Sequence, residues 1–342
     1  MLDCDRLLNG DRRALARAIT LVENDDPQAR AIIQQIYPHT GRAHIIGVTG
    51  APGYGKSTLV NAIARVYRQR DLKVGVIAVD PTSPFTGGAL LGDRVRMRDL
   101  AGDPGVFIRS MASRGYLGGL ARATAEVVLI LDAAGYQRIL VETVGVGQAE
   151  VDIARTAHTT VVVQTPGMGD EVQAIKAGIL EIADIFAINK ADQDGVERTE
   201  AALQMLLATN APAAATAERE PAWAPPIVRT IGTRGEGVVD LVDAIEAHAR
   251  AQRASGRWQT RERARAAFTL QELLRDELMA RLLARLPHDL LAAHLEQIAS
   301  RQIDPYAAVA ALLSAADPLV SDSPADDQPL EARAPLPQEE MP

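Results

Sequence analysis

Short apolar runs recur along the chain, and each is closed by a polar residue or a glycine. Helical patterns, such as those of residues 57–69 and 119–135, separate most of these runs. Continuous runs rich in Val and Ile that alternate with helices are typical of a parallel sheet with helices on both faces. The sequence therefore predicts an α/β fold. The predicted strands are His44–Thr49, Val74–Asp80, Arg138–Glu142, Thr160–Gln164, Asp184–Asn189 and Ile227–Thr230.

Helical segments flank the predicted sheet. Before it, Leu8, Leu15, Ile19 and Val22 fall at helical spacing, and residues 31–36 continue the pattern. These residues predict an N-terminal helical segment over residues 1–42.

The second half of the chain differs from the first in composition. Residues 211–226 are rich in Ala and Pro, which predicts a surface loop before the last strand. Residues 238–286 are strongly helical, and within them a leucine stripe recurs at intervals of four. Such a stripe is either a core face or a face for a partner helix or a second copy, and both interpretations stay open. From residue 321 onward the chain is acidic and Pro-rich, which predicts disorder. The stripe consists of Leu270, Leu274, Leu278 and Leu282.

Composition excludes several classes of protein. Hydrophobic residues make up 47% and charged residues 23%, which is ordinary for a globular chain and excludes wholesale disorder. The net charge of −8 argues against binding to a nucleic-acid backbone. Cys4 is the single cysteine, so no intrachain disulfide can form. The charged N-terminus lacks the apolar core of a signal peptide, and no apolar run approaches the roughly 20 residues that span a membrane. We therefore expect a cytoplasmic location without membrane attachment.

The strongest motif follows the first predicted strand. Gly50 to Ser57 match G-x-x-x-x-G-K-[ST] at every fixed position, between a strand and a helix as the motif requires. Backbone N–H groups of such a loop surround the β-phosphate, and the helix N-terminus adds partial positive charge. Lys56 is expected to bridge the β- and γ-phosphates, and the Ser57 hydroxyl to ligate Mg²⁺. The expected nucleotide-binding residues here are Gly50, Ala51, Pro52, Gly53, Tyr54, Gly55, Lys56, Ser57 and Thr58.

A second motif points to guanine. Asn189-Lys190-Ala191-Asp192 follows an apolar strand and has the N-K-x-D pattern of guanine-binding P-loop proteins. Guanine offers two donors on one edge, N1–H and the 2-amino group, and the carboxylate of Asp192 can accept both, whereas adenine has no matching pair. Asn189 is expected either to bind the ring edge or to tie its loop to the phosphate loop. The stem of Lys190 is expected to lie on the base face.

Acidic residues close two of the predicted strands. Asp80 and Glu142 each stand at a carboxyl end, which is the ligand edge of such a sheet. With Asp93 they are candidates for holding Mg²⁺, directly or through water. Gly145 follows in an E-x-x-G pattern, and its backbone is expected to sense a γ-phosphate. Gln148 is not next to Gly145, so no residue stands out as a water-positioning glutamine, and slow intrinsic turnover is expected.

Four arginines are candidates for neutralising transition-state charge or for merely facing solvent. They are Arg94, Arg96, Arg109 and Arg114.

Taken together, the motifs resemble one family, the MeaB/ArgK-type P-loop GTPases, which serve cobalamin-dependent acyl-CoA mutases. The likeness covers about residues 8–314. It is carried by the blocks Gly47–Thr58, Val79–Gly88, Leu91–Met97, Ile108–Gly119, Glu142–Gln148, Asn189–Asp192 and Asp304–Ala307.

The resemblance implies a P-loop NTPase domain flanked by N-terminal helices and a C-terminal helical arm used in homodimerisation. It implies GTP hydrolysis with Mg²⁺, and it matches Asp80, Asp93 and Glu142 to the family's magnesium and switch acids. Residues 165–176 match a mobile loop that responds to nucleotide and partner. The expected divisions are a helical segment (1–42), a GTP-binding domain (43–250), a dimerisation arm (251–318) and a disordered tail (319–342).

Two segments depart from the family pattern, and one of them is the acidic, Pro-rich tail after about residue 317. The guanine-contacting segment usually reads Ser-Ala, but here it is Thr230-Ile231-Gly232. Backbone N–H contacts to the base oxygen are compatible with this change, while a hydroxyl contact from the Ser position is not.

The resemblance implies a role in delivering, protecting or reactivating adenosylcobalamin on a mutase such as methylmalonyl-CoA mutase, with that cofactor belonging to the partner. A kinase of the arginine/ornithine transport type and a nucleotide-gated scaffold with negligible hydrolysis are the alternatives.

Overall fold

The computed structural model describes residues 4–80, 100, 102–112, 119–143, 149–167, 181–209, 223–287 and 289–316. The chain divides into two compact units, Met1–Leu270 and Gln271–Pro342. The sequence-based domain boundaries stay predictions, and the first unit extends past residue 250. Residues 211–222 of the expected loop over 211–226, and the acidic tail, lie outside the described residues.

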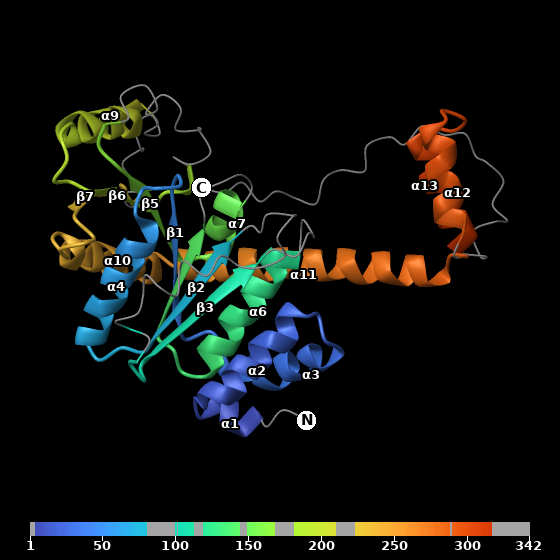
Figure 1. The fold of residues 1–342 in the computed structure, drawn as a ribbon, viewed down its shortest axis with the longest axis horizontal. Coiled ribbons are helices and arrows are strands. Elements are labelled where there is room, and N and C mark those ends of the chain that lie inside the picture. The colour runs from blue at the N-terminus through green and yellow to red at the C-terminus, as the bar shows by residue number, and fades with distance from the viewer. Residues whose placement is uncertain are drawn as a thin grey trace. The chain divides into compact units, whose positions relative to one another are not determined.

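A seven-stranded sheet forms the centre of the first unit (Figure 1), and its strands run in the order β3-β2-β4-β1-β5-β6-β7. Every neighbouring pair is parallel, which confirms the predicted α/β fold. The strands are β1 His44–Thr49, β2 Val74–Asp80, β3 Val106–Ala112, β4 Arg138–Thr143, β5 Thr159–Gln164, β6 Ile185–Asn189 and β7 Ile227–Thr230.

The edge strand β3 was absent from the sequence prediction. Its apolar run is interrupted by Arg109 and Ser110, so it does not read as a buried strand. Arg109 bonds the side chains of Glu23 and Thr20, which belong to an N-terminal helix. Arg109 therefore anchors that helix to the sheet edge, and its Glu23 partner accounts for its charge. Arg94, Arg96 and Arg114 lie outside the described residues.

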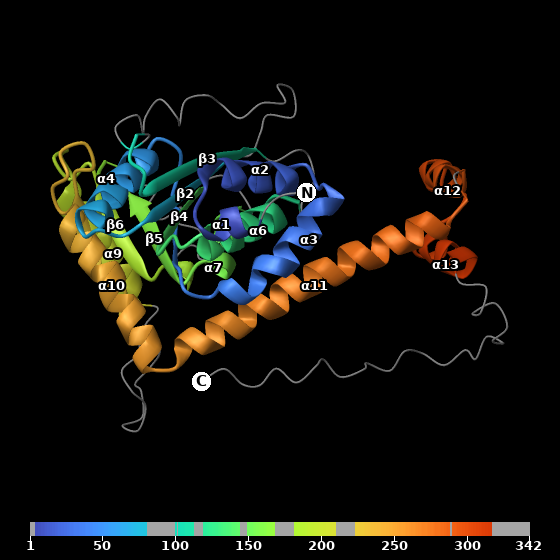
Figure 2. The ribbon, with the colours of Figure 1, turned by 90° about the horizontal axis from the view of Figure 1, so that it is seen from below.

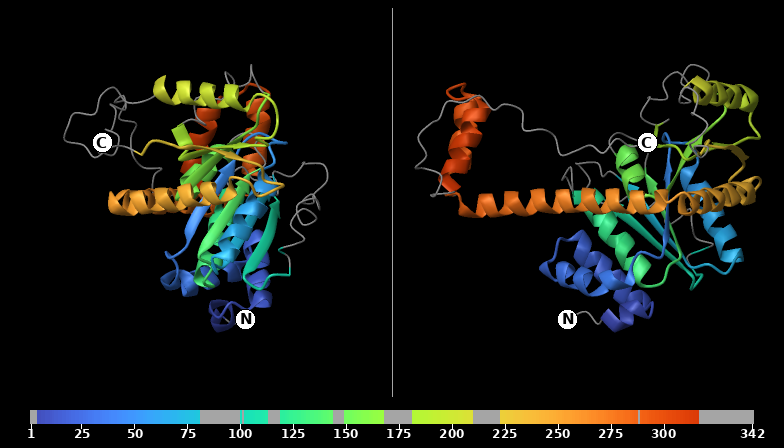
Figure 3. Two further views of the ribbon diagram at one scale, coloured as in Figure 1. Left: turned by 90° about the vertical axis from the view of Figure 1, so that its left-hand side faces the viewer. Right: turned by 180° about the vertical axis from the view of Figure 1, so that it is seen from behind.

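Helices cover both faces of the sheet because successive strand residues point in opposite directions. One face packs on α4 (Lys56–Gln69) and α10 (Val238–Ala254), which lie beside each other in the right-hand view of Figure 3. The other face packs on α6 (Gly119–Ala133), α7 (Ala149–Thr156) and, around β5 and β6, α9 (Val196–Thr209). The sheet thus buries nearly continuous apolar strands, as a parallel sheet requires.

The N-terminal helices pack against α6 (Figure 2). They are α1 Cys4–Leu8, α2 Arg12–Glu23 and α3 Pro27–Ile36, followed by the 3₁₀ turn Tyr37–His39. Asp11 caps α2 by accepting the N–H groups of Arg13 and Ala14. Leu15, Ile19 and Val22 are buried in the core shared with α6, so the helical spacing of the sequence marks the face that packs.

The expected helical stretch over residues 238–286 is two helices. Gly256, with φ of 71°, separates α10 from α11 (Arg257–Arg285), because a left-handed residue ends a helix. The structure leaves no residue of α11 buried, and Leu270, Leu274 and Leu278 are 66%, 54% and 58% exposed. The stripe is therefore not a core face of this chain.

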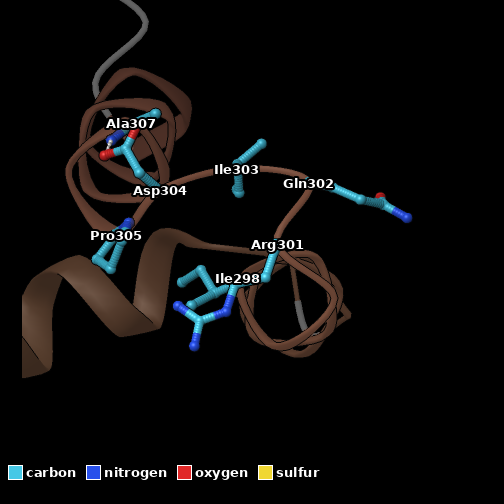
Figure 4. Close-up of a pocket in the computed structure, with 7 residues that line it drawn as sticks. All are labelled: Ile298, Arg301, Gln302, Ile303, Asp304, Pro305 and Ala307. Carbon is cyan, nitrogen blue, oxygen red and sulfur yellow. Dashed lines mark hydrogen bonds between the residues drawn. The ribbon is translucent and has the colours of Figure 1, made fainter.

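The second unit continues with α12 (Leu290–Ala299) and α13 (Pro305–Ala316). Asp304 caps α13 by accepting the N–H groups of Tyr306 and Ala307 at 2.8 and 3.0 Å. This cap gives the Asp304–Ala307 block a structural role. An open pocket lies at the turn between the two helices (Figure 4), and it is lined by Ile298, Arg301, Gln302, Ile303, Asp304, Pro305 and Ala307.

No helix in the described part of the chain combines the length and apolar character needed to cross a membrane.

Candidate nucleotide site

The phosphate loop connects the central strand β1 to the start of α4. Gly50 has φ of 141°, and a Cβ there would lie 2.4 Å from the carbonyl oxygen of Val163. Gly55 has φ of 81°, and a Cβ there would lie 2.5 Å from Nδ2 of Asn189. Both positions therefore require glycine, for backbone conformation and for space. In this conformation the phosphate loop lies against Val163 of β5 and against Asn189 at the end of β6.

Lys56 opens α4 and is 6% exposed. Its ammonium group donates hydrogen bonds to the carbonyl oxygens of Gly50 at 2.6 Å and Ala51 at 3.0 Å. These bonds hold a positive charge inside the curve of the loop, at the N-terminus of the helix. Phosphate oxygens are the ligands that a positive charge at a helix N-terminus favours.

Ser57 and Glu142 meet at the carboxyl edge of the sheet. The Ser57 hydroxyl donates to Oε1 of Glu142 at 2.6 Å, and both residues are buried. Beside them, the Thr143 hydroxyl donates to the Thr49 hydroxyl at 3.0 Å. A hydroxyl and a carboxylate are the oxygen donors that Mg²⁺ prefers, so these residues fit the expected ion.

The other expected acids and the γ-phosphate sensor are only partly described. Asp80 ends β2 opposite Ala112 of β3, so its backbone lies at the same edge of the sheet as Glu142. Asp93 and Gly145 lie outside the described residues, as does most of the 165–176 segment.

Asn189 joins three segments of the site. Its Nδ2 donates to the carbonyl oxygen of Tyr54 in the phosphate loop at 2.9 Å. Its Oδ1 accepts the N–H of Gly232 at 3.0 Å and the hydroxyl of Thr230 at 3.3 Å. Of the two contacts considered for Asn189, the structure shows the tie to the phosphate loop. Within the Thr230–Gly232 segment, the N–H of Gly232 therefore points at Asn189.

The rest of the N-K-x-D segment lies on the same side. Lys190 has a left-handed backbone with φ of 57°, and its ammonium donates to the carbonyl oxygen of Gly53 at 2.9 Å. The side chain of Asp192 is 45% exposed and forms an ion pair with Arg234 at 3.4 Å. Sequence reasoning missed Arg234. Its signal is one basic residue in the Gly-rich turn that follows β7.

The strands that carry the site begin in a buried polar network. Nε2 of His44, the first residue of β1, lies 2.8 Å from the Thr159 hydroxyl, which lies 2.8 Å from Nδ1 of His248. Asp184, just before β6, accepts two hydrogen bonds from Arg261 of α11 at 2.7 and 2.9 Å. Burial alone would raise the pKa of Asp184, but the bonds from His248 and Arg261 outweigh it and lower the pKa to about 2.

His158 extends this network to α11. Its Nδ1 accepts the backbone N–H of Ile45 at 3.0 Å, so the ring proton belongs on Nε2, which faces Glu262. The ring stacks on Trp258 with centroids 3.9 Å apart. Burial lowers the pKa of His158 to about 4, although Glu262 opposes the shift. The start of α11 is therefore fixed to the amino ends of the strands whose other ends form the nucleotide site.

Comparison with known proteins decides the family. Residues 15–286 match the family described as methylmalonyl Co-A mutase-associated GTPase MeaB. The chain belongs to the MeaB family. Family membership makes it a P-loop GTPase, in agreement with the phosphate loop and the Asn189–Asp192 segment.

Named relatives agree with this placement. A putative GTPase of Pyrococcus abyssi is 49% identical over 309 residues, covering 90% of this chain and 94% of the relative. The mouse mitochondrial methylmalonic aciduria type A homolog is 35% identical, covering 73% of this chain and 63% of the relative. The crystal structure of a protein named LAO/AO transport system kinase superposes with a TM-score of 0.67 at 30% identity, covering 91% of this chain and 95% of that one.

Proposed function

We propose that this MeaB-family GTPase is a chaperone of an adenosylcobalamin-dependent acyl-CoA mutase, methylmalonyl-CoA mutase or a relative such as 2-hydroxyisobutyryl-CoA mutase. It would assist cofactor loading, protection or reactivation in the cytoplasm, and adenosylcobalamin would belong to the partner. The observation that carries the proposal is the match of residues 15–286 to a mutase-associated GTPase family. The mouse relative's name, which refers to methylmalonic aciduria, supports methylmalonyl-CoA mutase as the kind of partner.

The phosphate end of the site supplies positive charge and oxygen ligands. Lys56 and the backbone N–H groups of the phosphate loop would bind the β- and γ-phosphates. Ser57 and Glu142 would hold Mg²⁺ together with Asp80 and Asp93, and the ion would neutralise charge on the phosphate oxygens. The Ser57–Glu142 contact at 2.6 Å supports this assignment, because it brings two oxygen donors from different elements to one point.

The base end would read guanine through Asp192. Its carboxylate would accept N1–H and the 2-amino group, while Lys190 would lie along the base face. Asn189 would hold this loop to the phosphate loop, as its bonds to Tyr54 and Gly232 indicate. The two ends of the nucleotide would therefore be read by loops that are hydrogen-bonded to each other.

We also propose a homodimer formed through the C-terminal helices. Large apolar side chains are exposed on all three of them, and such a surface usually marks an interface. A second copy of this chain would cover it. The exposed residues are Leu270, Leu273, Leu274, Leu278, Met279, Leu283, Leu291, Leu295, Tyr306, Val309 and Leu313.

The experiment that tests the proposal is GTP hydrolysis by the purified protein, alone and with a candidate adenosylcobalamin-dependent mutase at matched concentration. We expect slow turnover alone and marked stimulation by the mutase. Lys56→Ala is the control, since loss of the phosphate-loop ammonium should remove most nucleotide binding. Turnover that no such mutase changes would contradict the partner and favour a nucleotide-gated scaffold.

The kinase alternative has one observation in its favour, since the solved relative is named as a transport system kinase. The same assay separates it from hydrolysis. Label from [γ-³²P]GTP should appear as inorganic phosphate if the protein is a GTPase, and on an acceptor if it is a kinase.

A further inference from the structure

An ion pair spans the two loops that flank the proposed base position. Nη2 of Arg234 lies 3.4 Å from Oδ2 of Asp192, and its Nε lies 3.0 Å from Oε1 of Glu236. All three side chains are about half exposed, at 54%, 45% and 59% for Arg234, Asp192 and Glu236. Arg234 therefore bridges two carboxylates, one of which belongs to the N-K-x-D segment.

Backbone hydrogen bonds fix both ends of this ion pair. In the turn that carries Arg234, the N–H of Ile231 donates to the carbonyl oxygen of Glu236 at 2.9 Å. The N–H of Arg234 donates back to the Ile231 carbonyl oxygen at 3.0 Å. On the opposite loop, the N–H of Ala191 donates to the Thr230 carbonyl oxygen at 3.1 Å. With both backbones held, the pair opens most easily by side-chain rotation.

We propose that Arg234 competes with guanine for one oxygen of Asp192 and thereby sets nucleotide affinity and base selectivity. The inference rests on the proposed role of Asp192 as the guanine-reading carboxylate. Guanine presents two donors on one edge and needs both carboxylate oxygens. In this proposal, guanine binding displaces Arg234 from Oδ2, and Arg234 keeps its ion pair with Glu236. Because the pair is exposed, the competition costs a modest part of the binding affinity.

Hypoxanthine distinguishes this competition from general effects on binding. It has the N1–H donor of guanine but lacks the 2-amino group, so it needs one oxygen of Asp192 and leaves the other to Arg234. Arg234 therefore weakens the binding of guanine nucleotides and leaves the binding of inosine nucleotides nearly unchanged. The presence of Arg234 narrows the preference for guanine over hypoxanthine.

Calorimetric titration of GDP and IDP into the full chain with Mg²⁺ tests the inference. Arg234→Met, which keeps side-chain length without charge, is expected to bind GDP up to about fivefold more tightly, the value of an exposed ion pair. IDP affinity should stay the same. Glu236→Gln removes the alternative partner of Arg234, so it should weaken GDP binding. The gain in Arg234→Met should shrink at high salt, because screening weakens exposed pairs.

The inference would be overturned by weaker or unchanged GDP binding in Arg234→Met, by equal changes for GDP and IDP, or by shifts of the same sign in Arg234→Met and Glu236→Gln. Thermal unfolding of each variant verifies that it is folded. Asp192→Asn separates the two levels of the argument. If it does not alter base preference, the proposed reading of guanine fails; if it does and Arg234→Met has no effect, the competition alone fails.

Discussion

The hydroxyl of Ser57 donates a 2.6 Å hydrogen bond to Oε1 of Glu142, although 85 positions separate the two residues in the chain. Ser57 lies in the first turn of α4, and Glu142 lies near the end of β4, beside β1. The register that pairs Val48 with Glu142 brings them together. The two oxygens that are proposed to bind Mg²⁺ here are therefore Oγ of Ser57 and Oε1 of Glu142.

Replacing Glu142 by Gln should raise the Mg²⁺ concentration that GTP hydrolysis requires. The amide oxygen can still accept the Ser57 hydroxyl, but the negative charge that attracts the ion is lost. We expect the Mg²⁺ concentration for half-maximal GTP hydrolysis to rise by roughly 10- to 100-fold. Titration of hydrolysis with MgCl₂ measures it. Ser57→Thr, which keeps a hydroxyl, should change the requirement much less; an unchanged requirement in Glu142→Gln would remove Glu142 from the ion's ligands.

Replacing Gly50 by Ala should destabilise the fold around the phosphate loop. The new Cβ would lie 2.4 Å from the Val163 carbonyl oxygen. The alanine would also have to adopt a φ of 141°, which is unfavourable for a residue with a side chain. Gly135 is a matched control, since its φ is 84° and nothing lies within 4 Å of a Cβ there. Urea unfolding should show a loss of about 1 kcal/mol in Gly135→Ala and a clearly larger loss in Gly50→Ala. Equal losses would mean that the loop can move away from β5.

The stability of the protein should fall as the pH drops from about 6.5 to 4. Burial lowers the folded-state pKa of His158 from 6.5 to about 4, so in this window the unfolded chain binds the proton that the folded chain excludes. The stability present at neutral pH is lost progressively on acidification, by about 3 kcal/mol for this group. Burial also lowers the pKa of His44, which adds to the same slope.

The variant His158→Asn isolates this contribution, because an amide oxygen can replace Nδ1 as acceptor for the Ile45 N–H. Its unfolding free energy should be lower at pH 7 and depend less on pH between 6.5 and 4. His39→Asn, at an exposed position on the 3₁₀ turn, should leave the slope of the wild type unchanged. A slope in His158→Asn as steep as in the wild type would rule out His158 as its source.

The sequence anticipated elements whose residues form continuous patterns. Six of the seven strands read as apolar runs, and the phosphate loop and the N-K-x-D segment appear where strands end. β3 was not predicted because Arg109 interrupts its apolar run and pairs with Glu23 of α2. The break between α10 and α11 escaped because one glycine, Gly256, sets it. The first is a tertiary contact and the second is the backbone conformation of one residue, and local periodicity contains neither.

Contacts between residues of the site could not be predicted from the sequence. Both Ser57 and Glu142 are identifiable from motifs, but their hydrogen bond depends on strand register. Asn189 had two possible contacts in the sequence, and the position of Tyr54 selects one. Arg234 carries no motif, and its relation to Asp192 follows from the adjacent positions of β6 and β7.

The central proposal for this site is that Asp192 reads the guanine base. Binding of GTP and xanthosine triphosphate should therefore be compared between the wild type and Asp192→Asn. We expect the variant to lose roughly 10- to 100-fold in GTP affinity and to gain affinity for xanthosine triphosphate, whose 2-oxo group accepts the new amide donor. A variant that keeps the wild-type preference for GTP would show that another group reads the base.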